Sequence, residues 1–217
     1  MKTFGKALII TVVLALVAGL SFAFDMVIGE TGISLNGERQ HLRTQETNLG
    51  NLITDMIRYY TGADIAVYNG GGIRASADLG ELTLENAMEI MAFNNEVVVL
   101  KMSGAQIIAM LEHGVSSFPE VSGKFLQVSG IRFFFDPSMP PGERIWMAFV
   151  GNDPLMPGKM YTVATNEFLA AGGDAYTMLE TAEVIATADR TDQEMLIAYI
   201  QEFSPLFPMV EGRIVVW

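Results

Sequence analysis

The segment spanning residues 69–74, Asn-Gly-Gly-Gly-Ile-Arg, contains the residue types needed to bind a small anion. Consecutive glycines allow the backbone to turn tightly and to approach a ligand closely, and Arg74 supplies a planar, permanently charged guanidinium that suits phosphate. The segment is not a P-loop, because no Lys-Ser or Lys-Thr pair follows it, and it lacks the G-x-G-x-x-G spacing of dinucleotide sites. A ligand-binding turn and a purely structural turn therefore both remain open.

Two further arginines precede the first predicted helix. Arg39 and Arg43 are four residues apart, with His41 between them. In a helical or turn conformation, both guanidinium groups could face one anion near the N-terminus of that helix. Without other evidence, the same pattern describes a solvated surface.

Two segments carry aromatic and polar residues that could hold a nucleoside. Phe93 and Asn95 precede a predicted strand, whereas Phe168 and Asp174 flank a glycine pair. Two aromatic faces can stack on a base, an amide can hydrogen-bond its edge, and a carboxylate can accept hydrogen bonds from two sugar hydroxyls. The alternative is that both phenylalanines are core residues and that the aspartate caps a plain turn.

Histidine and cysteine counts argue against catalysis by this chain alone. A two-metal phosphatase needs several His, Asp and Asn ligands around its ions, but the chain has only His41 and His113, far apart in sequence, and no cysteine. No Gly-x-Ser-x-Gly nucleophile motif is present. His113, beside Glu112 at the end of a predicted helix, is expected on the solvated surface. We therefore assign no catalytic residue, metal ligand or cofactor to this chain.

Hydrophobic periodicity predicts the elements that must position these residues. Helices are expected at residues 47–60 and 83–91, from residue 103 to before residue 115, and at residues 191–203; strands are expected at residues 65–68, 96–102, 126–135, 145–150, 160–165 and 214–217. The strand at 145–150 is expected to return antiparallel to 126–135 after a proline-rich turn. Strands joined by turns, mixed with helical crossovers, predict an α+β fold with a mixed sheet flanked by helices.

The first residues have the pattern of an export signal. Lys2 and Lys6 form a basic start, residues 7–20 are almost wholly apolar, and Ser21 and Ala23 are the small residues that a signal peptidase reads. We expect a signal peptide over residues 1–23, cleaved after Ala23, and a periplasmic or secreted protein that leaves the membrane. The alternative is an N-terminal membrane anchor, because the apolar run of about 18 residues is near the lower limit for spanning a bilayer.

The rest of the chain, residues 24–217, fits one domain whose core is large enough to fold without disulfides. The absence of cysteine excludes Cys-ligated zinc but not an oxidising compartment. The formal net charge of -12 at pH 7 repels nucleic acids and anionic membranes. Any phosphate that binds is therefore expected to be small and held locally by the arginines.

Four segments together resemble the C-terminal domain of the 5'-nucleotidases, a family that includes periplasmic UDP-sugar hydrolases and 2',3'-cyclic phosphodiesterases. They are residues 43–55 (RTQETNLGNLITD), 69–74 (NGGGIR), 125–132 (FLQVSGIR) and 164–176 (ATNEFLAAGGDAY), and they follow one another in the order of the family. The resemblance covers nearly all of the predicted mature chain, from about residue 28 to residue 217. It implies a nucleotide-binding domain, since in this family a separate N-terminal metallophosphatase domain performs hydrolysis.

The resemblance also implies a role for each candidate residue. Phe93 and Phe168 are similar to the two rings that sandwich the base, Asn95 to the residue on the base edge, and Asp174 to the ribose-binding carboxylate. Gly123 has the position of a glycine whose backbone faces the base. The phosphate is expected at the arginines that resemble those of the family, which are Arg39, Arg43 and Arg74.

Three functional hypotheses follow from the resemblance. The first is an exported domain that binds a purine nucleoside or nucleotide, in nucleotide catabolism or scavenging. The second is the substrate-binding subunit of a split 5'-nucleotidase, in which divalent metals are held only by a separate metallophosphatase chain. The third is an interaction module that keeps the fold without a ligand.

Overall fold

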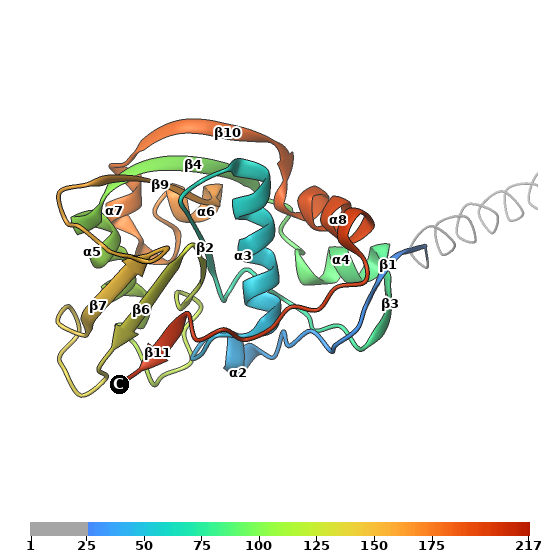
Figure 1. Cartoon of the computed structure of the whole chain (residues 1–217), viewed down its shortest axis with the longest axis horizontal. Helices are drawn as coiled ribbons and strands as arrows, with labels where there is room; N and C mark the ends of the chain where they lie inside the picture. Colours follow the sequence, from blue (N-terminus) through green and yellow to red (C-terminus); the bar gives the residue numbers. More distant parts are fainter. Residues whose placement is uncertain (1–25) are drawn as a thin grey trace, which may run out of the picture.

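The computed structural model describes residues 26–217, so the predicted signal peptide and its cleavage after Ala23 lie outside the described residues. Its centre is a five-stranded mixed sheet with the strand order β10-β4-β9-β2-β5, of which β10, β4 and β9 cross the upper part of Figure 1. Only β2 and β9 run parallel, whereas the other neighbours are antiparallel. These strands are β2 (Ile65–Asn69), β4 (Glu96–Ser103), β5 (Leu126–Ser129), β9 (Met160–Asn166) and β10 (Glu183–Thr191).

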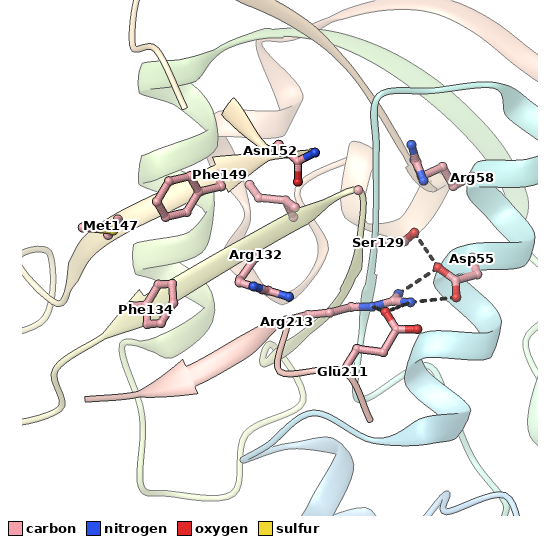
Figure 2. A pocket seen from close by; sticks show the side chains of 13 residues that line it. Asp55, Arg58, Ser129, Arg132, Phe134, Met147, Phe149, Asn152, Glu211 and Arg213 are labelled. Carbon is pink, nitrogen blue, oxygen red and sulfur yellow. Dashed lines mark hydrogen bonds and ion pairs between the residues drawn. The ribbon is translucent and has the colours of Figure 1, made fainter. Parts of the chain in front are cut away.

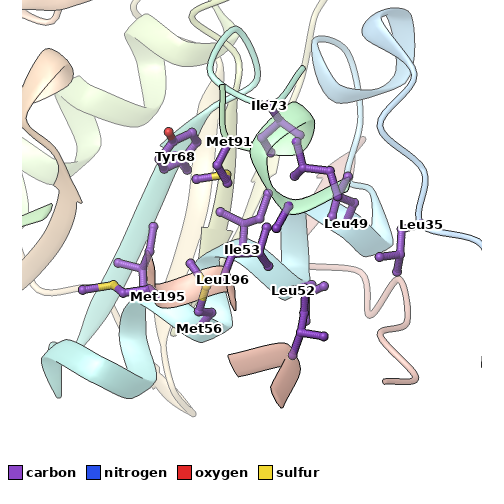
Figure 3. Packing of buried hydrophobic residues seen from close by; sticks show 14 of the residues in the cluster. Leu35, Leu49, Leu52, Ile53, Met56, Tyr68, Ile73, Met91, Met195 and Leu196 are labelled. Carbon is purple, nitrogen blue, oxygen red and sulfur yellow. The ribbon is translucent and has the colours of Figure 1, made fainter. Parts of the chain in front are cut away.

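Helices cover both faces of the central sheet, as the sequence predicted. On one face lie α3 (Asn48–Thr61), α4 (Leu84–Ile90) and α8 (Asp192–Phe203). On the other lie α5 (Gly104–Val115), α6 (Glu167–Ala170) and α7 (Thr177–Glu180). Figure 3 shows the first core, where side chains of α3 and α8 pack against Tyr68 of β2. Alternate residues of β2 enter the two cores, and its five residues are all buried because the sheet is covered on both sides.

The four longer helices begin where the sequence places a capping residue. The Thr47 hydroxyl accepts a hydrogen bond from the Gly50 amide at the start of α3. Thr83, Ser103 and Thr191 each form a capping box with the residue three positions later, before α4, α5 and α8. These local hydrogen bonds satisfy helix N–H groups that have no partner within the helix, which explains why the helix starts were predictable.

The predicted strand at residues 126–135 is wrong, because it is two strands in different sheets. β5 ends at Ser129 and β6 (Ile131–Phe135) begins after Gly130, which has a φ of 75°. A side chain at Gly130 would collide with the backbone oxygen of Asp64. Val128 and Ile131 belong to the same core, although side chains three apart on an unbroken strand face opposite sides. The left-handed glycine resets this alternation.

Two smaller sheets complete the fold. β6 pairs antiparallel with β7 (Ile145–Val150), as predicted, in a four-stranded sheet of order β11-β6-β7-β8. Its edges are β11 (Ile214–Val216) and β8 (Asp153–Pro154). The second is the antiparallel pair of β1 (Val27–Thr31) and β3 (Gly80–Thr83), which the sequence did not reveal.

Short helical turns lie between these elements. They are α2 (Arg39–Leu42) and the 3-10 turn η1 (Gly173–Ala175). Within residues 26–217, none of the helices has the length and apolarity needed to cross a bilayer.

Candidate functional site

Strand direction brings one set of loops together at a single edge of the central sheet. The carboxyl ends of β2 and β9 meet the amino end of the antiparallel β4, where Val97 pairs with Asn166. A cavity of about 390 Å³ lies at this edge. Six of the eight candidate residues line it, namely Arg43, Phe93, Asn95, Gly123, Phe168 and Asp174, together with Asn69, Gly71, Gly72 and Asn166.

The two phenylalanines of this cavity are exposed rather than part of the core. Phe93 is 59% exposed and Phe168 is 45% exposed. Phe168 lies in the first turn of α6, which Asn166 caps by accepting a hydrogen bond from the amide of Leu169. A side chain at Gly173 would lie 2.6 Å from the Phe168 ring, so this glycine is needed for the observed ring position. Both rings are therefore available to a planar ligand, and the alternative of two core phenylalanines is wrong.

Asp174 has an unusual backbone conformation that its neighbours hold in place. Asp174 and Ala175 both have positive φ angles, 52° and 65°, a conformation that costs free energy in residues other than glycine. The Asn69 Nδ2 donates to Asp174 Oδ2 over 2.8 Å, and the Asn166 Nδ2 donates to Asn69 Oδ1 over 3.1 Å. Asn69, the first residue of the glycine turn, therefore fixes one carboxylate oxygen.

His113 corrects the expectation of a solvated surface residue. It is partly buried, and its Nε2 lies 2.8 Å from the backbone oxygen of Asp174. Its ring meets the ring of Tyr176 edge-on, with the centroids 4.6 Å apart. No sequence pattern indicated this contact, because η1 reaches the end of α5 only through the tertiary fold.

The glycine turn lies against the loop that contains Gly123. The Gly71 amide donates to the Gly123 oxygen over 2.8 Å, and the Gly70 amide donates to the Phe125 oxygen over 2.7 Å. The Cβ position of Gly123 lies 3.7 Å from Asp174 Oδ2. Gly123 therefore lies beside the aspartate, and its backbone forms one wall of the cavity.

The arginines define a second, adjoining cavity of about 250 Å³. Arg43 lines both cavities, whereas Arg39 and Arg74 line only the second. Arg74 of the second cavity lies beside Phe93 of the first, with its guanidinium carbon 5.6 Å from the centroid of the Phe93 ring. Within the described part of the chain, none of these three arginines is within ion-pair distance of a carboxylate.

Arg43 is the most unusual of the three. It is 8% exposed, and its Nε has no hydrogen-bond partner among the described residues. Burial, followed by the charges of Arg39 and Arg74, lowers the pKa of its guanidinium. Burying a cation beside two like charges costs free energy unless an anion compensates it. The cluster therefore has the electrostatics of an anion site.

Asn95 is held from behind by residues that the sequence did not single out. Its Nδ2 donates to Asp192 Oδ2 over 2.9 Å and to the Tyr68 hydroxyl over 3.2 Å. Tyr68 ends the apolar run before the glycine turn, and Asp192 is the first residue of α8. No local pattern predicts this contact, because the three residues come from three distant segments.

A larger cavity, of about 580 Å³, lies elsewhere in the described chain. It lies between α3, the β5–β6 junction and β7, as Figure 2 shows. Arg213 lines this cavity, and its Nη1 and Nη2 donate to the two oxygens of Asp55 over 2.8 Å each. Its remaining donors contact Glu211 and the backbone oxygen of Val128. This buried arginine is fully paired and has no donor left for a ligand, although the exposed Arg132 also lines the cavity.

Comparison with known proteins explains this arrangement of sheet, helices and cavity. The model of the domain family described as "5'-nucleotidase, C-terminal domain" matches residues 27–181. The structure of a 5'-nucleotidase precursor from Thermus thermophilus superimposes on 94% of this chain with a TM-score of 0.88 and 40% identity. The chain therefore belongs to the 5'-nucleotidase C-terminal domain family, which confirms the resemblance.

Two curated relatives show how much of a larger protein the chain represents. The trifunctional nucleotide phosphoesterase protein YfkN of Bacillus subtilis (strain 168) is 36% identical over 197 residues, which are 86% of this chain and 14% of the relative. A 5'-nucleotidase of Diplobatis ommata is 32% identical over 209 residues, which are 87% of this chain and 36% of the relative. The chain also covers 42% of the Thermus protein. It thus spans the C-terminal domain and a minor part of each relative.

Proposed function

We propose that this domain binds a purine nucleoside or nucleotide in the cavity between Phe93 and Phe168. The supporting observation is that two exposed rings from different segments line one cavity, which adjoins three arginines without carboxylate partners in the described chain. Stacking on aromatic rings contributes about 1 to 3 kcal/mol per base. The base lies between the rings, and the phosphate lies toward Arg39, Arg43 and Arg74.

The other residues of the cavity suit a ribose and a base edge. Asp174 Oδ2 already accepts a hydrogen bond from Asn69, and a carboxylate has further lone pairs for sugar hydroxyls. Asn95 and the backbone of Gly123 lie on the same cavity and supply polar groups to the base. A mostly apolar slot with a few convergent polar groups is the general form of a small-molecule site.

The proposal is tested by calorimetry with adenosine and AMP, on the wild type and on Arg43→Met. We expect AMP to bind more tightly than adenosine by about 1.5 to 3 kcal/mol, the contribution of hydrogen bonds to a charged group. The substitution should remove most of this difference and leave adenosine binding almost unchanged. Arg132→Met is the matched control, since Arg132 is an exposed arginine on the larger cavity. No binding of either ligand at millimolar concentration would refute the proposal.

A second candidate is the substrate-binding subunit of a split phosphomonoester hydrolase. It is favoured by the relatives, which are named as nucleotidases and phosphoesterases and of which this chain covers a minor part. Residues 26–217 contain no group of three or more His, Cys, Asp or Glu residues placed to hold a metal ion. Phosphate release from AMP with manganese or cobalt should therefore require an added metallophosphatase chain, and release by the pure chain would contradict this candidate.

Export to the periplasm or to the medium is also part of the proposal. It rests on the basic start, the apolar run and the small residues at Ser21 and Ala23. A mass of the exported protein that corresponds to a start at Phe24 supports it, whereas an intact N-terminus in the membrane fraction supports the anchor.

A further inference from the structure

Asn95 lies on the proposed base site, and its amide group is oriented by a buried hydrogen-bond network. Its amino group has two hydrogens, and it donates to Asp192 Oδ2 and to the Tyr68 hydroxyl. The Tyr68 hydroxyl in turn donates to Asp192 Oδ2 over 2.7 Å. The backbone is fixed as well, because the Asp192 amide donates to the backbone oxygen of Asn95 over 2.9 Å. The position and the orientation of the side-chain amide are thus both determined.

Asp192 is not required to cap the helix that it begins. Thr191 is the N-cap of α8, and it forms a complete capping box with Glu194. The Asp192 side chain is nevertheless fully buried, and its Oδ1 has no partner among the described residues. Burial raises the pKa of this carboxyl, against the opposing effect of the hydrogen bonds from Tyr68 and Asn95. A buried carboxylate that is costly and unnecessary for the helix has another role.

The network determines which polar atom Asn95 offers to a ligand. Because both hydrogens of its Nδ2 point to Tyr68 and Asp192, the remaining group is Oδ1, an acceptor. None of the described residues donates to this oxygen. An acceptor on a base site favours a base with an N–H donor on the facing edge and disfavours one with a carbonyl there.

We propose that Asp192 is a positioning residue that, through Asn95, gives the cavity a preference for bases that carry an amino group on this edge, such as adenine. The proposal rests on the proposed function, since it concerns the same cavity. The role of Asp192 is indirect, because it contacts Asn95 and not the ligand.

The test compares three nucleosides that differ at the C6–N1 edge of the base: adenosine, which has a C6 amino group; purine riboside, which lacks it; and inosine, which has a C6 carbonyl and a hydrogen on N1. For the wild type, we expect adenosine to bind about fivefold to tenfold more tightly than purine riboside, and inosine to bind least. Asp192→Asn keeps the volume of the side chain but can donate as well as accept. The Asn95 amide can then turn, so the preference should fall to within about twofold and inosine should gain affinity.

Controls separate orientation of the amide from a general loss of structure. Thr191→Ala removes the cap of the same helix without touching Asn95, so the order of the three nucleosides should be unchanged. If circular dichroism shows that Asp192→Asn does not fold, Tyr68→Phe is the second variant, and it should reduce the preference for adenosine about twofold. The same preference in the wild type, in Asp192→Asn and in Tyr68→Phe would overturn the inference while leaving the proposed function intact. Failure of the wild type to bind any nucleoside would overturn both.

Discussion

The larger cavity and the pair of adjoining cavities at the candidate site differ in what their arginines do. In the larger one, Arg213 uses all its donors on Asp55, Glu211 and a backbone oxygen, and it ties α3 to the segment before β11 (Figure 2). In the two adjoining cavities of the candidate site, Arg43 is buried, and no carboxylate of the described chain lies within ion-pair distance of it. The difference teaches that the unused hydrogen-bonding capacity of a buried arginine, and not the volume of a cavity, marks the candidate site.

The aromatic residues of the two cavities differ in the same way. Phe134 and Phe149 of the larger cavity contact each other edge-on, with centroids 6.5 Å apart, and Phe134 also meets Trp146. Phe93 and Phe168 instead expose about half of their surface at the mouth of the smaller cavity. The rings of the first set are packed against one another, whereas Phe93 and Phe168 have no aromatic neighbour among the described residues and leave much of their surface accessible.

The strongest test of this comparison is Arg213→Ala. We expect it to lower the free energy of unfolding by about 3 kcal/mol, because it leaves Asp55, Glu211 and a buried carbonyl without their partner. This loss is at the lower end for buried ion pairs, since the Asp55 side chain is 39% exposed. Urea denaturation followed by circular dichroism measures the loss, and nucleoside binding should persist under native conditions. Arg132→Ala, at an exposed arginine of the same cavity, should change stability by less than about 0.5 kcal/mol.

A smaller effect is expected when the same aromatic residue is removed from each cavity. Phe168→Ala should weaken adenosine binding by about 1 to 3 kcal/mol, because one stacking face is lost. Phe149→Ala removes an equal side chain from the larger cavity and should leave adenosine binding unchanged. Calorimetry on the two variants measures both affinities. Equal losses, or a loss only for Phe149→Ala, would mean that the ligand does not bind between Phe93 and Phe168.

The smallest effect concerns the pH dependence of stability that the buried Asp192, beside the candidate site, produces. Asp192 has a raised pKa, so the folded state holds its proton more tightly than the unfolded state, and stability declines as pH rises from the ordinary carboxyl value of 3.8 through the raised value. Asp192→Asn removes this decline, so its stability relative to the wild type should increase from about pH 4 upward. Urea denaturation across this range measures the difference. A relative stability that falls with rising pH would contradict the burial effect.

Most of the fold could be predicted from the sequence where local signals decide the structure. Thr47 and Ser103 mark helix starts because a hydroxyl caps the first turn, and the Val97–Leu100 run forms a strand that is buried on both faces. β10 was missed because its residues are largely exposed, so its pairing with β4 leaves no hydrophobic alternation. The break between β5 and β6 at Gly130 was detectable in principle, because the apolar residues Val128 and Ile131 are three positions apart and do not fit the alternation of one continuous strand.

The candidate site was predictable in part. Sequence motifs indicated Phe93, Phe168 and Asp174, because their residue types suit a nucleoside and each lies near a strand end or a glycine pair. The supporting contacts were not predictable. Asp192 reaches Asn95 across 97 positions of the chain, and burial of a carboxylate depends on packing that no local pattern expresses.

The exposure of the Phe93 and Phe168 rings at the sheet edge determines the sign of the heat capacity change that would accompany ligand association. A flat molecule that enters between them removes apolar surface from water on both of its faces, and such burial makes the heat capacity change of association negative. The enthalpy of association therefore becomes more favourable on warming. This temperature dependence would come from the rings themselves, so it is expected for whichever base is found to bind there.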